Sequence, residues 1–145
     1  MTDWTLRVAK LRDLASDSIV EGDLEVALAR VAEAFTIVDA EGEQQHVVFA
    51  SLLCVAGDLA VMSDEYDSAL GLYQRAHQVG AATQADGSLI AKALVGLGSL
   101  AEADDDVAKA ADFYRSAVDA LGSSTHEDAE VAREAIREAL ERVSA

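Results

Sequence analysis

Three histidines and one cysteine are the side chains in this sequence with the clearest potential for metal binding or nucleophilic chemistry. His46, His77 and His126 each lack a second histidine or cysteine at ligand spacing on the same predicted helix. Cys54 has no basic neighbour in sequence that would stabilise a thiolate. We therefore interpret the histidines as surface or helix-end residues and Cys54 as an inert, partly buried thiol. We predict no metal, no cofactor and no enzymatic activity.

Two short motifs resemble ligand-binding loops but lack the necessary context. The three aspartates at 104–106 have neither the alternating oxygen ligands nor the central glycine of a calcium loop. They predict a solvated turn in which an aspartate caps the next helix. Gly96 and Gly98 lie within an apolar helical stripe with no strand before them, so we expect helix packing rather than phosphate binding. Trp4 could anchor a ligand, but we expect it to pack over the N-terminal end.

The strongly acidic balance limits the classes of partner. The net charge is −16, with 11 Lys and Arg against 27 Asp and Glu. Nucleic acid and anionic membrane surfaces both require clustered basic residues, so we predict neither as a partner. A basic partner fits this charge, and solvated acidic faces are the plainer interpretation. No apolar run approaches about 18 residues and no signal-peptide pattern begins the chain, so we expect a cytoplasmic protein. A single cysteine excludes an internal disulfide.

The elements that would position any site are helices arranged as repeats. Pairs of alanines seven residues apart recur at steps of 42 and then 41 residues: Ala27 and Ala34, Ala69 and Ala76, Ala110 and Ala117. Self-similarity at this period indicates a repeat array, and no segment alternates with a strand-like period of two. Small residues allow close helix crossings, and Tyr73 and Tyr114 are predicted to fill the core between them.

Apolar periodicity predicts one all-α domain over 1–145. The stripes predicted to be buried include Leu6 and Leu14 in the first helix, and Leu28 in the second. Capping-box spacing, Ser124 with Glu127 and Thr125 with Asp128, predicts the start of a last helix whose apolar stripe begins at Val131. The expected units are three helix pairs at about 5–41, 46–80 and 87–121, and a capping helix at about 125–143.

These residues resemble tetratricopeptide repeats. The second unit has the run Tyr66-Asp67-Ser68-Ala69 followed by Tyr73 and Ala76, and the third has Leu97-Gly98 followed by Ala110, Tyr114 and Ala117. The segment YDSALGLYQRA is similar to the longer repeats of the kinesin-light-chain type. The resemblance implies a right-handed superhelix of three antiparallel helix pairs with a C-terminal capping helix.

The resemblance also implies a ligand groove on the concave face. The first helix of each pair would line it with Arg12, Ser16, Ile19, Cys54, Asp58, Val61, Lys92, Val95, Ser99 and Glu102. The chain has no asparagine, so the carboxylate clamp of chaperone-tail binders is not implied. Only two of these groove residues are basic, so the acidic-peptide binding of kinesin light chains is not implied either.

The sequence therefore predicts a non-catalytic scaffold that binds a protein or peptide segment in this groove. Basic flanks on that segment would suit the acidic chain. An alternative remains open: the array could self-associate into a homo-oligomer through the groove or through an exposed end of the stack.

Overall fold

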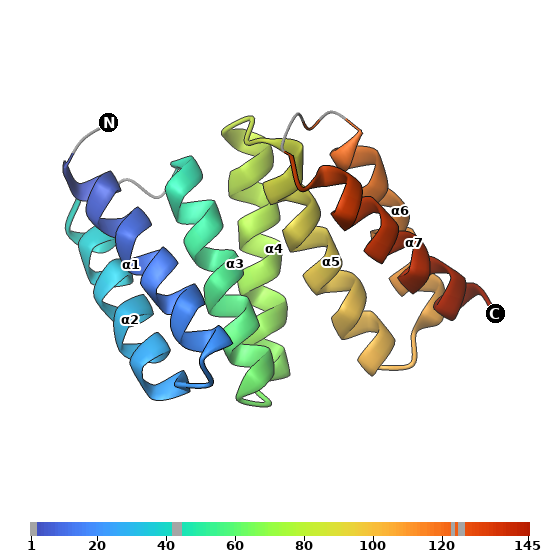
Figure 1. Cartoon of the computed structure of the whole chain (residues 1–145), viewed down its shortest axis with the longest axis horizontal. Coiled ribbons are helices and arrows are strands. Elements are labelled where there is room, and N and C mark those ends of the chain that lie inside the picture. The colour runs from blue at the N-terminus through green and yellow to red at the C-terminus, as the bar shows by residue number, and fades with distance from the viewer. Residues whose placement is uncertain (1–2, 42–44, 123, 125–126) are drawn as a thin grey trace.

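The computed structural model describes residues 3–41, 45–122, 124 and 127–145, and all the regular secondary structure within these residues is helical, as predicted (Figure 1). The helices run in the order α1 (Asp3–Val20), α2 (Leu24–Glu41), α3 (Val47–Met62), α4 (Tyr66–Ala82), α5 (Gly87–Ala103), α6 (Val107–Leu121) and α7 (Ala129–Ser144). No helix in the described ranges is long and apolar enough to cross a membrane.

The helices form two layers. The first six helices pack as three consecutive pairs, α1–α2, α3–α4 and α5–α6. The first helices of the pairs also pack on one another in the order α1, α3, α5, and α7 continues this row (Figure 1). The helix predicted as an end cap therefore occupies the place that the first helix of a fourth pair would take.

The turns within the three pairs share one geometry. Gly22, Asp64 and Asp105 all have a left-handed backbone, with φ of 82°, 58° and 60°. In each turn the following residue closes a backbone hydrogen bond to the end of the first helix: Asp23 N to Ser18 O at 2.8 Å, Glu65 N to Ala60 O at 2.8 Å, and Asp106 N to Ala101 O at 2.9 Å. Asp106 Oδ1 also accepts from Lys109 N at 3.1 Å, which confirms the predicted cap.

The paired alanines lie at the helix crossings. Ala27, Ala34, Ala69, Ala110 and Ala117 are fully buried, and Ala76 is almost so. The predicted core tyrosines are also buried, and their rings rest on glycine backbone. A Cβ added to Gly57 or Gly96 would lie 2.6 Å from the Tyr73 ring, and one on Gly98 would lie 2.6 Å from the Tyr114 ring. Gly96 and Gly98 therefore serve helix packing, as predicted.

The buried residues divide into two clusters along the stack. The N-terminal cluster joins α1, α2 and α3, with Ala76 and Val79 of α4 and Ala93 of α5. The C-terminal cluster joins α4, α5, α6 and α7, with Ala60 of α3. The middle helices α3, α4 and α5 contribute to both, so they connect the two parts of the core.

Several predictions of burial were wrong at the surface of the stack. Leu6 is 54% exposed, Leu14 38%, Leu28 48% and Val131 73%. Val8 and Ser18 are buried in α1, so its buried stripe is rotated from the predicted one. The first helix has a neighbour on only one side of the stack, and its remaining faces stay open to solvent.

The last helix also begins later than predicted. Its first helical residue is Ala129, after the N-cap residue Asp128. Ser124 is not the cap, because its hydroxyl donates to Asp86 Oδ1 at the start of α5, at 2.8 Å. The other predicted capping residue, Thr125, lies outside the described residues, as does His126.

Ala110→Leu should lower the free energy of unfolding by about 1–3 kcal/mol, because the larger side chain must enter a full helix crossing. Ala110 is 0% exposed, whereas Ala103 at the end of α5 is exposed. The matched change Ala103→Leu should therefore cost much less. Urea unfolding followed by circular dichroism measures both, and equal losses would contradict the packing described for Ala110.

Candidate functional site

One open groove collects nearly all of the residues predicted for the ligand site. It has a volume of about 980 Å³ and runs over α1, α3, α5 and α7. We call it the inner groove. The predicted residues that line it are Arg12, Ser16, Ile19, Cys54, Asp58, Val61, Lys92, Val95 and Ser99. Their spacing of three and four residues within each helix places them on one face, and the row of first helices brings those faces together.

The fourth wall of the inner groove comes from α7. Ala129, Ala132, Ala135 and Ile136 line it there. Sequence reasoning missed this wall, because α7 was interpreted only as a cap on the open end. The signal available in the sequence was the series of alanines in α7, which extends beyond one narrow stripe. Small side chains leave room for a ligand beside the helix.

Asp58 is the acidic residue that α3 contributes to the lining of the groove. Its Oδ1 accepts a hydrogen bond from the buried Tyr73, whose hydroxyl reaches the groove from α4. The carboxyl group faces the open groove, yet the surrounding walls remove part of its hydration. This desolvation raises the pKa of Asp58, opposed by the Tyr73 hydrogen bond and the charge of Lys92. Desolvation and the Asp58 contact also raise the pKa of Tyr73.

Cationic side chains flank this acid on both neighbouring helices. Arg12 of α1 donates to Ser51 Oγ at 2.8 Å and pairs with Asp13 at 2.9 Å, so its guanidinium is held in place. Lys92 of α5 is exposed, and its charge acts on Asp58. The inner groove therefore presents the Arg12–Asp13 ion pair on α1, the Asp58 carboxyl group on α3 and the Lys92 ammonium group on α5. Ile19, Val61 and Val95 add apolar surface to the same face.

Cys54 lines the groove, but its thiol is unreactive. It is 5% exposed, and burial together with the nearby Asp58 charge raises the pKa of its thiol to about 12. The thiol is therefore protonated at neutral pH, and the thiolate that would act as a nucleophile is almost absent. This agrees with the interpretation of Cys54 as an inert thiol.

Glu102 does not line the inner groove. It lies at the end of α5, where its two carboxylate oxygens bind the Arg142 guanidinium of α7 at 2.9 and 2.8 Å. The Tyr114 hydroxyl also donates to it, at 2.7 Å. The Arg142 and Tyr114 hydrogen bonds lower the pKa of Glu102 to about 2. Glu102 thus fastens α7 to α5, an ion pair that the sequence could not reveal because its partner is 40 residues away.

His46 and Trp4 have structural roles near the N-terminal end of the stack. His46 is the N-cap of α3, where its Nδ1 accepts from Val48 N at 3.0 Å. The rings of Trp4 and His46 meet edge to face, with 5.5 Å between their centroids, so Trp4 packs against the start of α3. No three Asp, Glu, His or Cys residues within the described ranges lie together as metal ligands would.

Comparison with known proteins finds a solved structure of similar fold. No protein-family model matches the sequence, and no curated protein matches it at a significant level. The chain is similar to the N-terminal domain of stress-induced protein-1 (STI-1) from C. elegans, with a TM-score of 0.63 and 16% sequence identity. The match covers 94% of this chain and 99% of that one. At this identity the likeness is one of fold, and the fold is a tetratricopeptide-like helical solenoid.

Proposed function

We propose that this chain is a non-catalytic interaction scaffold that binds a segment of a partner protein in the inner groove. The observation that carries the proposal is the groove itself. It is an open channel of about 980 Å³ on the face shared by all the first helices, and α7 closes one side. Apolar pockets with a few convergent polar groups are the usual form of a binding site. The tetratricopeptide-like fold supports the same class of function.

The chemistry of the inner groove indicates what its ligand would carry. Ile19, Val61 and Val95 suit small apolar side chains, and the alanines of α7 leave space for the ligand backbone. Asp58 suits one cationic side chain at the centre of the groove. Binding a cation there would favour the ionised carboxylate, whose pKa is raised in the free protein. The net charge of −16 would speed the approach of a segment with basic flanks.

Asp58→Arg and Val61→Glu should each abolish partner binding while the domain stays folded, because both positions lie on the floor of the groove. Central interface residues carry most of the binding free energy, at about 2 kcal/mol or more each. Glu138→Arg makes a charge reversal of the same size on an exposed face of α7 and should leave binding intact.

The partner would first be identified by capture from native lysate with mass spectrometry, and the three variants would then be compared by titration calorimetry. Thermal melts of each variant establish that it is folded. Loss of binding in Glu138→Arg with normal binding in both groove variants would move the functional surface away from the inner groove.

Self-association is the second candidate, and the exposed face of α1 favours it. Leu6 and Leu14 lie on that face, 54% and 38% exposed, at the end of the stack, where no other helix of the described residues packs. Sedimentation velocity over a range of concentrations tests this candidate. A dimer that persists at low micromolar concentration and dissociates in Leu6→Glu would support it, and a monomer throughout would exclude it.

A further inference from the structure

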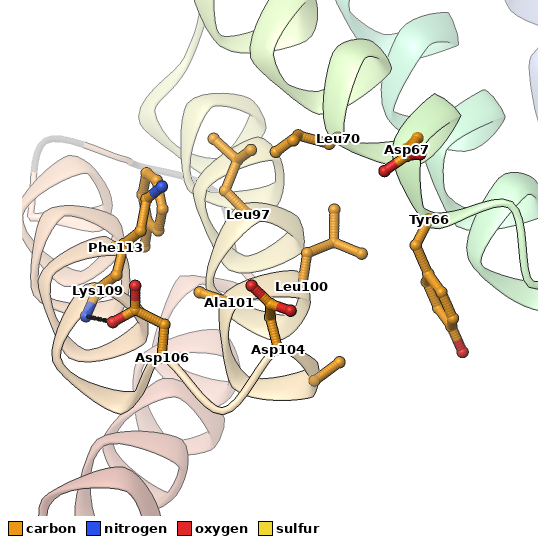
Figure 2. Close-up of a pocket in the computed structure, with 11 residues that line it drawn as sticks. Tyr66, Asp67, Leu70, Leu97, Leu100, Ala101, Asp104, Asp106, Lys109 and Phe113 are labelled. Atoms are coloured by element: carbon orange, nitrogen blue, oxygen red, sulfur yellow. Dashed lines mark hydrogen bonds between the residues drawn. The ribbon is translucent and has the colours of Figure 1, made fainter.

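A second cavity opens on the opposite layer of the molecule, between α4 and α6. It has a volume of about 360 Å³ and is formed by the start of α4, the end of α5 and the start of α6 (Figure 2). We call it the outer cleft. This volume lies at the lower end of the range of about 300–1,000 Å³ that is typical of ligand sites. None of its lining residues belongs to the inner groove.

The outer cleft is open because the two helices at its sides do not pack on each other. Both α4 and α6 contact α5, which therefore forms the floor between them. Figure 2 shows Leu97 and Leu100 of this floor between the side chains of the two flanking helices. Leu70 on the α4 side is 39% exposed and Tyr66 at the rim is 48% exposed. The cleft thus leaves apolar and aromatic surface uncovered.

The rim of the cleft is acidic. Asp67 stands on the α4 side, and Asp104 and Asp106 stand on the turn that joins α5 to α6. Lys109 is the basic residue of the lining. Asp106 is engaged in capping α6. Asp67 and Asp104 form no ion pair with any residue in the described part of the chain, and both are exposed.

We propose that the outer cleft is a second docking surface for a protein segment that carries one large apolar side chain next to lysine or arginine. The apolar side chain would lie on Leu70, Leu97 and Leu100. The neighbouring cation would bind the carboxylates of Asp67 and Asp104, which form no ion pair within the described residues. The floor and the rim together therefore favour a segment in which an apolar side chain stands next to a basic one. Because the two cavities share no residue, the scaffold could hold one segment in the inner groove and another in the outer cleft.

Amide chemical shifts of the isotope-labelled full chain test this proposal with a defined probe, the blocked tripeptide Lys-Phe-Lys. Two matched probes separate the contributions: Glu-Phe-Glu reverses the charge and Lys-Gly-Lys removes the apolar side chain. We expect Lys-Phe-Lys to shift the amides of Leu70 and Leu100 saturably, and each matched probe to bind about tenfold more weakly. Equal binding of Glu-Phe-Glu, or shifts confined to the inner groove, would overturn the proposal.

Variants locate the binding on the outer cleft. Asp67→Lys with Asp104→Lys, both at exposed positions, should weaken Lys-Phe-Lys binding about tenfold. Leu70→Asp should weaken it as well, and Glu138→Arg should not. Unchanged affinity in the double lysine variant would show that the rim does not recognise the cation. A second copy of this chain is the competing occupant: a dimer that Leu70→Asp dissociates would replace the proposed partner segment and overturn the proposal.

Discussion

Deletion of α7, residues 129–145, should make the protein aggregate or dimerise while it keeps most of its helix content. Ile136, Ala139 and Val143 of α7 are buried against the last helix pair, and the Arg133 guanidinium donates to the carbonyl of Leu121 at 2.9 Å. Without α7, the apolar flank of α5 and α6 and the last carbonyls of α6 face water. Repeat arrays need a polar-faced end for solubility, so the truncated stack should associate with other molecules through its exposed apolar surface.

Size-exclusion chromatography with light scattering measures the mass of the truncated chain, and circular dichroism measures its helicity. Arg142→Ala is the matched control, because it removes only the ion pair to Glu102. That pair is partly exposed, with side-chain exposures of 59% and 26%, so its loss should change the free energy of unfolding only slightly. A truncated protein that stays monomeric with an unchanged melting temperature would show that α7 contributes nothing to the stack.

Gly98→Ala should destabilise the fold, whereas Gly71→Ala should stabilise it, although both glycines lie within helices. A Cβ at Gly98 would lie 2.6 Å from the buried Tyr114 ring, so the ring or the helix must move. Such overpacking typically costs about 1–3 kcal/mol. A Cβ at Gly71 meets no atom within 4 Å, and alanine there gains up to about 1 kcal/mol from helix propensity.

Urea denaturation of the two single variants gives both free energies of unfolding. Gly96→Ala, whose new Cβ would lie 2.6 Å from the Tyr73 ring, should behave like Gly98→Ala. Stabilisation at all three glycines would mean that helix propensity, rather than contact with the tyrosine rings, governs these positions.

The arrangement of the helices was predictable because it follows from local rules. Alanine at each crossing, glycine beneath Tyr73 and Tyr114, and an aspartate or glycine at each turn within a pair recur at nearly constant spacing. A repeat array uses one packing solution several times, so a short pattern specifies much of the fold. The floor of the inner groove was predictable for the same reason. Residues such as Asp58 and Val61 share a face through helical spacing alone.

The features that sequence reasoning missed depend on contacts between distant segments. The helical spacing of Glu102 continues the groove face along α5, but its carboxylate is bound by the Arg142 guanidinium of α7. Leu6 and Leu14 fit a helical stripe, but the position of α1 at the end of the stack leaves them exposed. The outer cleft depends on the separation of α4 and α6, a distance that no spacing within one helix encodes.

The division of the core into two clusters has a consequence for how the molecule responds to disturbance. Among the described helices, neither α1 nor α2 contacts α6 or α7, so these two ends interact through α3, α4 and α5. In such a nearest-neighbour chain, cooperativity is set by the weakest internal junction rather than by the total buried area. A ligand that stabilises one half would slow amide hydrogen exchange there first. Exchange in the other half would slow only to the extent that α3, α4 and α5 couple the stabilities of the two halves.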